Sequence, residues 1–242
     1  KEHNIVVKKS ISIRGTGNPV IDGENLETIF HISANNFSVQ GLTIINVGKS
    51  FTKDFAGILI SRSSNFLIKN VVLKNVFFVI LIEKSKHGTI SYNKVSSNAI
   101  TEASSGNGIH LWHCDHMQVD NNTLTGLRDG IYFEFVKESK IFKNRSYKNL
   151  RYGLHFMFSN NDSYYDNEFV DNGVGVAVMF SKFIDMSNNL FTKNWGSASY
   201  GLLLKEIYDA KIENNKFTTN TVGVSVDGST RVSFEGNLFA KN

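Results

Sequence analysis

Four side chains that could bind a soft metal ion recur at related positions in the middle of the chain. His110, His155, Met157 and Met179 each lie in a short apolar segment that follows a glycine. Met157 and Met179 occupy the same position in successive repeats, so their backbones would lie about 4.8 Å apart. Thioether sulfur combined with imidazole favours Cu(I) over harder divalent ions. These four residues are therefore candidate copper ligands.

The same side chains allow a second interpretation, in which they form a docking surface. His110 stands two repeats before His155, roughly 10 Å away, with Tyr132 between them. The two imidazoles share one ion only if both lean toward it, and otherwise His110 marks a second site. Exposed methionine and aromatic side chains are also typical of partner-binding patches. The residues expected on such a docking face are Trp112, Tyr132, Glu134, Trp195 and Tyr200.

A second group of possible ligands lies in the segment HLWHCDHM. His113, Cys114 and His116 are close together there, and this density suits Cu(I) or zinc. Their spacing matches no closed zinc motif, and the segment lies where a strand turns. They are secondary metal candidates, and a solvated turn is the competing interpretation.

The elements that must position these residues form a repeat. An origin can be set at the glycine before each apolar segment, and Val79 takes the same place in one segment. The steps between origins are 22, 29, 22, 23, 22, 26 and 22 residues. The origins are Gly57, Val79, Gly108, Gly130, Gly153, Gly175, Gly201 and Gly223. A period this short is typical of stacked coils of short strands. We predict an all-β, right-handed parallel β-helix of roughly ten coils, forming a single domain over residues 1–242.

Asparagines and strand alternation add detail to this coil. From Gly108 onward an asparagine follows each origin by 14 residues, and from Gly130 another follows by 19. Asparagine tolerates left-handed turns and can bond to its equivalent in the next coil. Residues one and three after each origin are apolar and should face inward, so residues two and four should face outward. His110, His155, Met157 and Met179 all occupy these outward positions.

Three long insertions precede the same strand of the coil. They lie between Asn46 and Gly57, between Asn98 and Gly108, and between Asn194 and Gly201. All three would project along one edge of the face that carries the candidate ligands, which implies a groove or docking surface there. The chain also starts inside a strand pattern and stops within a repeat, so we expect a fragment of a longer repeat array.

Composition narrows the possible functions. The net charge of +4 over 242 residues is small and evenly spread, so no nucleic-acid partner is expected. The single cysteine excludes an internal disulfide framework. A β-helix could instead be a polysaccharide lyase, hydrolase or epimerase, or a module that only binds carbohydrate. The acids available for such catalysis are Asp129, Glu134, Asp162 and Asp171, and no outward column stacks two carboxylates in adjacent coils. Catalysis is therefore disfavoured.

Several longer motifs resemble one family. GNGIHL, RDGIYFEFV, NLRYGLHFMFS, DNGVGVAVM and NWGSASYGLLLK are similar to segments of the NosD family, periplasmic β-helix proteins, and GNPVIDGE and VQGLTI resemble its opening coils. The resemblance covers essentially the whole chain and is densest from Gly106 to Lys205. The family pattern matches His155 and Met157 in RYGLHFMF, Met179 in VAVM and His110 in GIHL.

This resemblance implies a non-enzymatic role in the periplasm. NosD-like proteins work with an ABC transporter to assemble the copper–sulfur centre of nitrous-oxide reductase. The partners implied are the transporter's membrane subunits, a copper chaperone lipoprotein and the apo-reductase, and the implied cofactor is copper, as Cu(I). The HCDHM segment is not part of the matching pattern, so His113, Cys114 and His116 gain no support from it.

Overall fold

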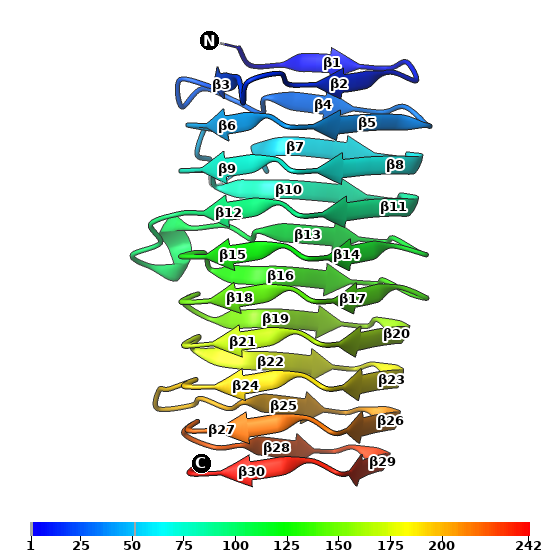
Figure 1. Cartoon of the computed structure of the whole chain (residues 1–242), viewed down its shortest axis with the longest axis vertical. Helices are drawn as coiled ribbons and strands as arrows, with labels where there is room; N and C mark the ends of the chain where they lie inside the picture. Colours follow the sequence, from blue (N-terminus) through cyan, green and yellow to red (C-terminus); the bar gives the residue numbers. More distant parts are fainter. Residues whose placement is uncertain (1, 51) are drawn as a thin grey trace.

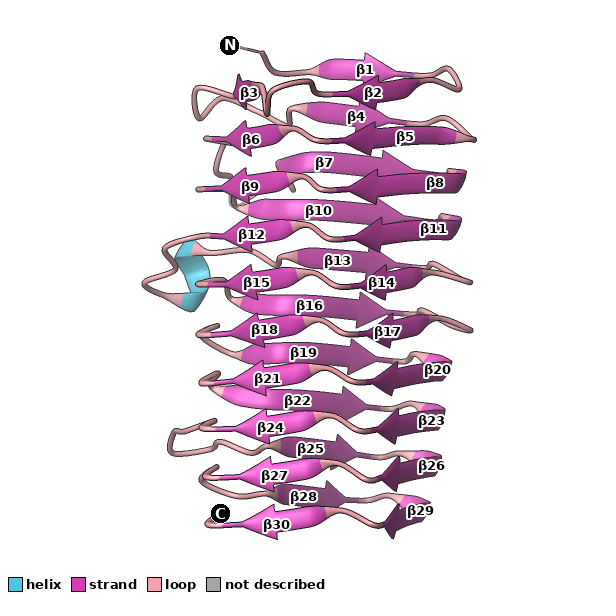
Figure 2. Cartoon of the chain, viewed as in Figure 1, coloured by secondary structure: helices cyan, strands magenta, loops and turns pink. Residues whose placement is uncertain are grey.

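The computed structural model describes residues 2–50 and 52–242 and shows a right-handed parallel β-helix (Figure 1). Within the described residues, three sheets of ten strands each run along the stack, and all strand pairs are parallel. One strand of each sheet makes one coil, so ten coils are present, as the repeat predicted. Strands dominate the described part, and its one short helix, η1 (Glu102–Ser104), lies in a loop (Figure 2).

The strands of each sheet follow one another in coil order. The first sheet contains β1 (Ile5–Val7), β4 (Phe30–Ile32), β7 (Ala56–Ser61), β10 (Phe78–Glu83), β13 (Ile109–Trp112), β16 (Asp129–Glu134), β19 (Tyr152–Met157), β22 (Val174–Met179), β25 (Leu202–Lys205) and β28 (Val224–Asp227). The second contains β2 (Ser12–Arg14), β5 (Phe37–Gln40), β8 (Ser64–Lys69), β11 (Lys86–Ser91), β14 (Gln118–Asp120), β17 (Lys140–Phe142), β20 (Asn160–Tyr165), β23 (Lys182–Ser187), β26 (Tyr208–Glu213) and β29 (Thr230–Glu235). The third contains β3 (Val20–Asp22), β6 (Thr43–Ile45), β9 (Val72–Lys74), β12 (Lys94–Ser96), β15 (Thr123–Thr125), β18 (Arg145–Tyr147), β21 (Glu168–Val170), β24 (Leu190–Thr192), β27 (Lys216–Thr218) and β30 (Leu238–Ala240).

The interior is filled by the apolar residues that the alternation assigned to it. Ile109, Ile131 and Leu154 pair in successive strands of the first sheet and are fully buried. Aromatic rings stack along the third sheet, with centroids 5.4 Å apart for Phe169 and Phe191 and 4.6 Å apart for Phe191 and Phe217. Each such stacked pair contributes about 0.5–1.5 kcal/mol of stability beyond that gained by burying its surface.

Two asparagine ladders hold the corners, as the 14- and 19-residue spacings predicted. Asn144 Nδ2 donates to Asn167 Oδ1 at 3.1 Å, and Asn167 Nδ2 donates to Asn189 Oδ1 at 3.0 Å. The second ladder includes the bond from Asn149 Nδ2 to Asn172 Oδ1 at 2.9 Å. Each amide is buried, so these bonds satisfy groups that water cannot reach.

The left-handed backbone at these corners lies one residue earlier than expected. Lys143, before Asn144, has φ 55°, and Asp166, before Asn167, has φ 57°. Asn70 likewise has φ 54° and precedes Val71, whose N–H bonds to the ladder residue Asn93. The ladder position in that coil is therefore occupied by Val71 and not by an asparagine.

The glycine origins are explained by how closely consecutive coils approach at the start of the first sheet. A Cβ on Gly153 would lie 2.6 Å from the carbonyl oxygen of Gly175 and 2.9 Å from Asn172 Nδ2. Backbone cannot yield to such a contact without shifting the coil. Glycine is needed here for space and not for its conformational freedom.

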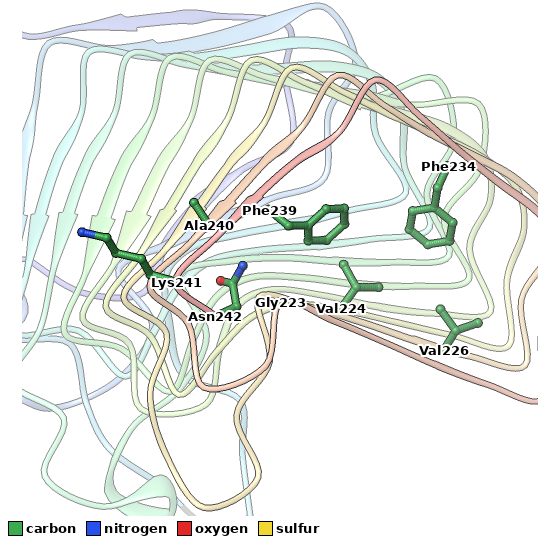
Figure 3. Close-up of a pocket in the computed structure, with 8 residues that line it drawn as sticks. All are labelled: Gly223, Val224, Val226, Phe234, Phe239, Ala240, Lys241 and Asn242. Atoms are coloured by element: carbon green, nitrogen blue, oxygen red, sulfur yellow. The ribbon is translucent and has the colours of Figure 1, made fainter.

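The long insertions lie between the third and first sheets, as predicted. The loops before β13 and before β25 project on the same side of the stack in Figure 1, and η1 belongs to the first of them. At the C-terminal end, Val224, Val226, Phe234 and Phe239 continue the interior columns and line a pocket of about 530 Å³ (Figure 3). The described residues contain no helix with the length and apolarity needed to cross a membrane.

Candidate functional site

Strand register places the candidate ligands in the two outward columns that the repeat predicted. One column runs Leu81, His110, Tyr132, His155 and Ala177, and the other runs Glu83, Trp112, Glu134, Met157, Met179 and Lys205. Together, His110, Tyr132, His155, Met157 and Met179 form what we name the His–Met face. It lies on the outer side of β13, β16, β19 and β22.

The two methionines are direct neighbours on this face. Met157 pairs with Met179 in adjacent strands, and both side chains are partly exposed. The Tyr132 hydroxyl lies 3.7 Å from the Met157 sulfur and can donate a weak hydrogen bond to it. Burial, followed by the neighbouring Glu134 carboxylate, raises the pKa of Tyr132 to about 12, so the hydroxyl keeps its proton. Two adjacent thioethers are thus accessible from solvent.

His155 is not exposed, and the expectation that it faces water is wrong. Its side chain points outward in register, yet the residue is only 4% exposed. The rings of Tyr152 and Tyr132 lie 4.5 and 5.0 Å from the imidazole and cover it. Alternation along a strand determines the side to which a residue points, whereas the burial of its side chain from solvent depends on neighbouring side chains.

An ion cluster around the buried Asp129 adjoins His155. Asp129 is 1% exposed, and its Oδ2 lies 4.0 Å from His155 Nδ1 and 3.8 Å from Arg128 Nε. Its Oδ1 lies 3.8 Å from Arg151 Nε. Arg151 also pairs with Glu102 of the η1 loop at 3.6 Å. This cluster joins the first sheet to the loop beside it.

Burial keeps both imidazoles of the face neutral. Burial first, and then Arg151 and Arg128, lowers the pKa of His155 to about 3. Burial and Arg128 lower the pKa of His110 to about 4. Burial raises the pKa of Asp129 despite the two arginines. A neutral imidazole is the form that binds metal, so neither histidine must lose a proton near pH 7.

His110 and His155 are separated by an aromatic ring. The Tyr132 ring lies 4.6 Å from His110 and 5.0 Å from His155. Asn107 belongs to the loop before β13, and its Nδ2 lies 3.5 Å from His110 Nδ1. Of the arrangements that the sequence left open, the geometry favours one that keeps His110 apart from His155.

The secondary cluster does not form one site, because the turn directs its members differently. Cys114 lies in the core, 1% exposed, with Sγ 3.5 Å from the carbonyl oxygens of Ile82 and Trp112. Because it is buried, Cys114 does not belong to a solvated turn, and burial raises the pKa of its thiol to about 12. His113 stacks on Phe135 at 4.6 Å, and His116 faces Asp115 and Glu138. His113 and His116 have left-handed φ values of 51° and 52°, and Cys114, which lies between these outward corners, turns inward.

The expected docking residues fall into two groups. Trp112, Tyr132 and Glu134 lie on the first sheet, where the Lys84 ammonium sits 4.9 Å from the Trp112 ring. Trp195 is 57% exposed in the loop before β25 and lines a pocket of about 360 Å³ with Arg151 and Tyr152. Tyr200 is partly buried at the end of that loop. This pocket lies beside the side chains that cover His155.

An aromatic ridge beside the methionines was not anticipated. Phe135, Phe158 and Phe180 are exposed and stack in adjacent coils, with centroids 5.1 and 5.2 Å apart. Phe158 and Phe180 directly follow Met157 and Met179. The signal was present, because a phenylalanine stands five residues after three consecutive origins. We name these three residues the Phe ridge.

The four acids considered for catalysis lie in different environments. Asp129 is the buried member of the ion cluster, and Asp162 lies inside the coil, where it accepts a hydrogen bond from the Ser139 N–H at 2.8 Å. Glu134 is partly exposed beside Met157, and Asp171 is exposed at a turn after β21. No two of these four are paired in register in the described strands.

Comparison with known families shows to which family the chain belongs. Residues 93–242 match NosD, described as "Periplasmic copper-binding protein (NosD)". The chain belongs to the NosD family. All members of the His–Met face lie within the matched residues. The "Probable ABC transporter binding protein NosD" of Pseudomonas aeruginosa is 25% identical over 129 residues, which cover 52% of this chain and 30% of that protein. The match thus spans less than a third of that relative.

Solved structures support the coil architecture of this NosD-family chain. The polygalacturonase from Erwinia carotovora superposes with a TM-score of 0.72 at 12% identity, covering 98% of this chain and 80% of that chain. The mannuronan C-5 epimerase AlgE4 A-module of Azotobacter vinelandii gives a TM-score of 0.68 at 12% identity, covering 97% and 80%. At such identities the likeness concerns the fold alone.

Proposed function

We propose that this NosD-family chain is a non-enzymatic, periplasmic component for maturation of the copper–sulfur centre of nitrous-oxide reductase. In this role the His–Met face binds Cu(I) and passes it on. The family's description as copper-binding and periplasmic supports the metal and the compartment. The pairing of Met157 with Met179 in adjacent strands supports the oxidation state, because thioethers prefer Cu(I).

One observation carries this proposal. Among the described residues, neither ring nitrogen of His155 has a hydrogen-bond partner, although both are buried. A buried polar atom without a partner costs about 1–3 kcal/mol, so such atoms usually have a role. His155 precedes Met157 by two residues on the same side of β19. A copper ion held by Met157 and Met179 would give the imidazole the partner that it lacks.

The cover over His155 suggests how the ion would be transferred. Solvent reaches the methionines first, and the imidazole lies behind Tyr152 and Tyr132. Cu(I) would bind the sulfurs and recruit His155 when the Tyr152 ring moves. His110, beyond Tyr132, would be a second point of contact for the ion and not a ligand in the same shell.

The partners proposed are a copper chaperone lipoprotein, the apo-reductase and the membrane subunits of an ABC transporter. The name of the Pseudomonas aeruginosa relative, an ABC transporter binding protein, supports the transporter. The Phe ridge and Trp195 lie on either side of the His–Met face and offer apolar contact to a donor or acceptor. Aromatic anchors near the point of transfer are typical of interface hot spots.

Anaerobic Cu(I) titration against a competing chelator tests the copper site. Met157→Leu/Met179→Leu removes both sulfurs at nearly constant volume. Phe158→Asn/Phe180→Asn is the matched control, because it alters the next residue in the same coils and keeps a side chain that tolerates φ near 50°. We expect the methionine variant to lose the tight site and the phenylalanine control to retain it.

Two results would contradict the proposal. If wild type and the leucine variant compete equally with the chelator, the methionines do not bind the ion. Epimerisation or depolymerisation of a uronic-acid polymer by the wild-type chain would contradict the non-enzymatic role, and the fold neighbours make that assay a necessary control.

A further inference from the structure

A second group of metal-binding side chains lies at the corner between the first and second sheets, away from the His–Met face. It consists of His87, Asp115 and His116, with Glu138 beside them. His87 is the second residue of β11 in one coil, Asp115 and His116 occupy the equivalent corner of the next coil, and Glu138 that of the coil after. His87, His116 and Glu138 each stand eight residues after an origin of the repeat, at Val79, Gly108 and Gly130, so the period aligns them although one coil has 29 residues.

The backbone positions these residues by coil-to-coil hydrogen bonds. The His87 N–H donates to the Asp115 carbonyl oxygen at 3.2 Å, and the His116 N–H donates to the Lys137 carbonyl oxygen at 3.1 Å. His87 and His116 share left-handed φ values of 54° and 52°, so they occupy equivalent corners. Their rings consequently lie one above the other, with centroids 4.8 Å apart.

The potential ligand atoms converge. One atom from each of His87, Asp115 and His116 can be chosen so that all three lie within 4.8 Å of one another. Asp115 Oδ1 lies 3.0 Å from His116 Nδ1, and Glu138 Oε2 lies 2.7 Å from His116 Nε2. One imidazole thus has a carboxylate on each ring nitrogen. In the pattern usual for metal sites, one ring nitrogen binds the ion while the other donates its proton to a carboxylate.

We propose that His87, Asp115 and His116 bind a divalent ion of the zinc and copper(II) class, with Glu138 orienting His116. Two imidazoles with a carboxylate suit these borderline ions, whereas calcium and magnesium prefer oxygen ligands alone. The group has no sulfur ligand, which distinguishes it chemically from the Cu(I) site proposed on the His–Met face. In this arrangement His116 Nε2–H donates to Glu138, and Nδ1 faces the ion together with Asp115.

The side chains can close around an ion at small cost. Tetrahedral ligands at about 2.0–2.1 Å from zinc lie about 3.3 Å from one another, so the group must contract modestly. His116 and Glu138 are each 47% exposed, and the Asp115 side chain is 31% exposed. Exposed rotamers can make this adjustment while the corner backbone stays in place. Water would complete the coordination.

Isothermal titration of the tag-free chain with Zn²⁺, and separately with Cu²⁺, tests the proposal. His87→Asn/His116→Asn removes both imidazoles and keeps residues that tolerate the left-handed backbone. His113→Asn is the matched control, because His113 has φ 51° in the same turn but stacks on Phe135 outside the group. Circular dichroism confirms that each variant is folded.

We expect one equivalent of at least one of the two ions to bind wild type and the His113→Asn control, and to be lost from the double variant. Glu138→Gln should weaken binding by about 10–100-fold without changing its stoichiometry. Met157→Leu/Met179→Leu should leave this site intact, so the two proposals fail independently. The inference is overturned if neither ion binds wild type, or if the double variant binds as wild type does.

Discussion

The ring of Tyr152 lies 4.5 Å from the ring of His155 and covers an imidazole that has no hydrogen-bond partner among the described residues. Tyr152→Ala should therefore expose His155 and move its pKa from about 3 toward the ordinary value near 6.5. Histidine NMR titration measures this change. Tyr147→Ala, a partly buried tyrosine on the third sheet, is the control. An unchanged His155 pKa in Tyr152→Ala would show that the other neighbours alone keep the imidazole desolvated.

The buried imidazole also makes stability depend on pH. The pKa of His155 is about 3 in the folded chain and near 6.5 when unfolded, so the unfolded state binds more protons between these values. The stability that its neutral form contributes is complete above pH 6.5 and is lost as pH falls, at up to about 1.4 kcal/mol per pH unit.

Urea unfolding of wild type and His155→Gln between pH 7 and 4.5 measures the contribution of His155 to the free energy of unfolding. The wild-type curve should fall more steeply as the pH is lowered. Asp129, whose pKa is raised, has the opposite sign, since its contribution is lost as pH rises through its folded pKa. It is present in both proteins, so the difference between the curves isolates His155. Parallel curves would contradict the prediction.

Asn167 should be among the most sensitive positions of the corner ladder. Its side chain donates to Asn189 Oδ1 at 3.0 Å and to the Ile141 carbonyl oxygen at 2.9 Å, and it accepts from Asn144. Asn167→Ala leaves several buried groups without partners, at about 1–3 kcal/mol each. We expect a loss of about 3 kcal/mol or more in urea unfolding, against less than about 0.5 kcal/mol for the exposed Asn98→Ala. Equal losses would show that the ladder adds little.

Gly153→Ala should disrupt the coil for steric reasons. The added methyl group would lie 2.6 Å from the carbonyl oxygen of Gly175, and backbone on both sides must move. Overpacking of this kind costs about 1–3 kcal/mol and occasionally more. Gly196→Ala in the loop before β25 is the control, because its methyl group would approach only Ser199, at 3.5 Å. A lower melting temperature for Gly153→Ala alone supports the interpretation, and equal melting temperatures refute it.

The sequence by itself determined the coil, its register and the composition of each outward column. This was possible because a repeat places equivalent residues one above another, so the spacing from Gly130 to Gly153 and Gly175 reproduces the pairing of Tyr132 with His155 and Ala177. The asparagine ladders and the side from which the long loops project followed from the same periodicity.

Only the tertiary structure decided which of these side chains are covered and which meet across coils. His155 points outward as the pattern requires, yet Tyr152 and Tyr132 bury it. Cys114 turns inward between two outward histidines because left-handed corners interrupt strand alternation. His87 and His116 stand at the same position of successive coils, but only the structure shows that their rings and the Asp115 carboxylate converge. Periodicity sets the direction of a side chain and its partner in the next coil, while its burial and the convergence of side chains at a corner depend on packing that the period does not encode.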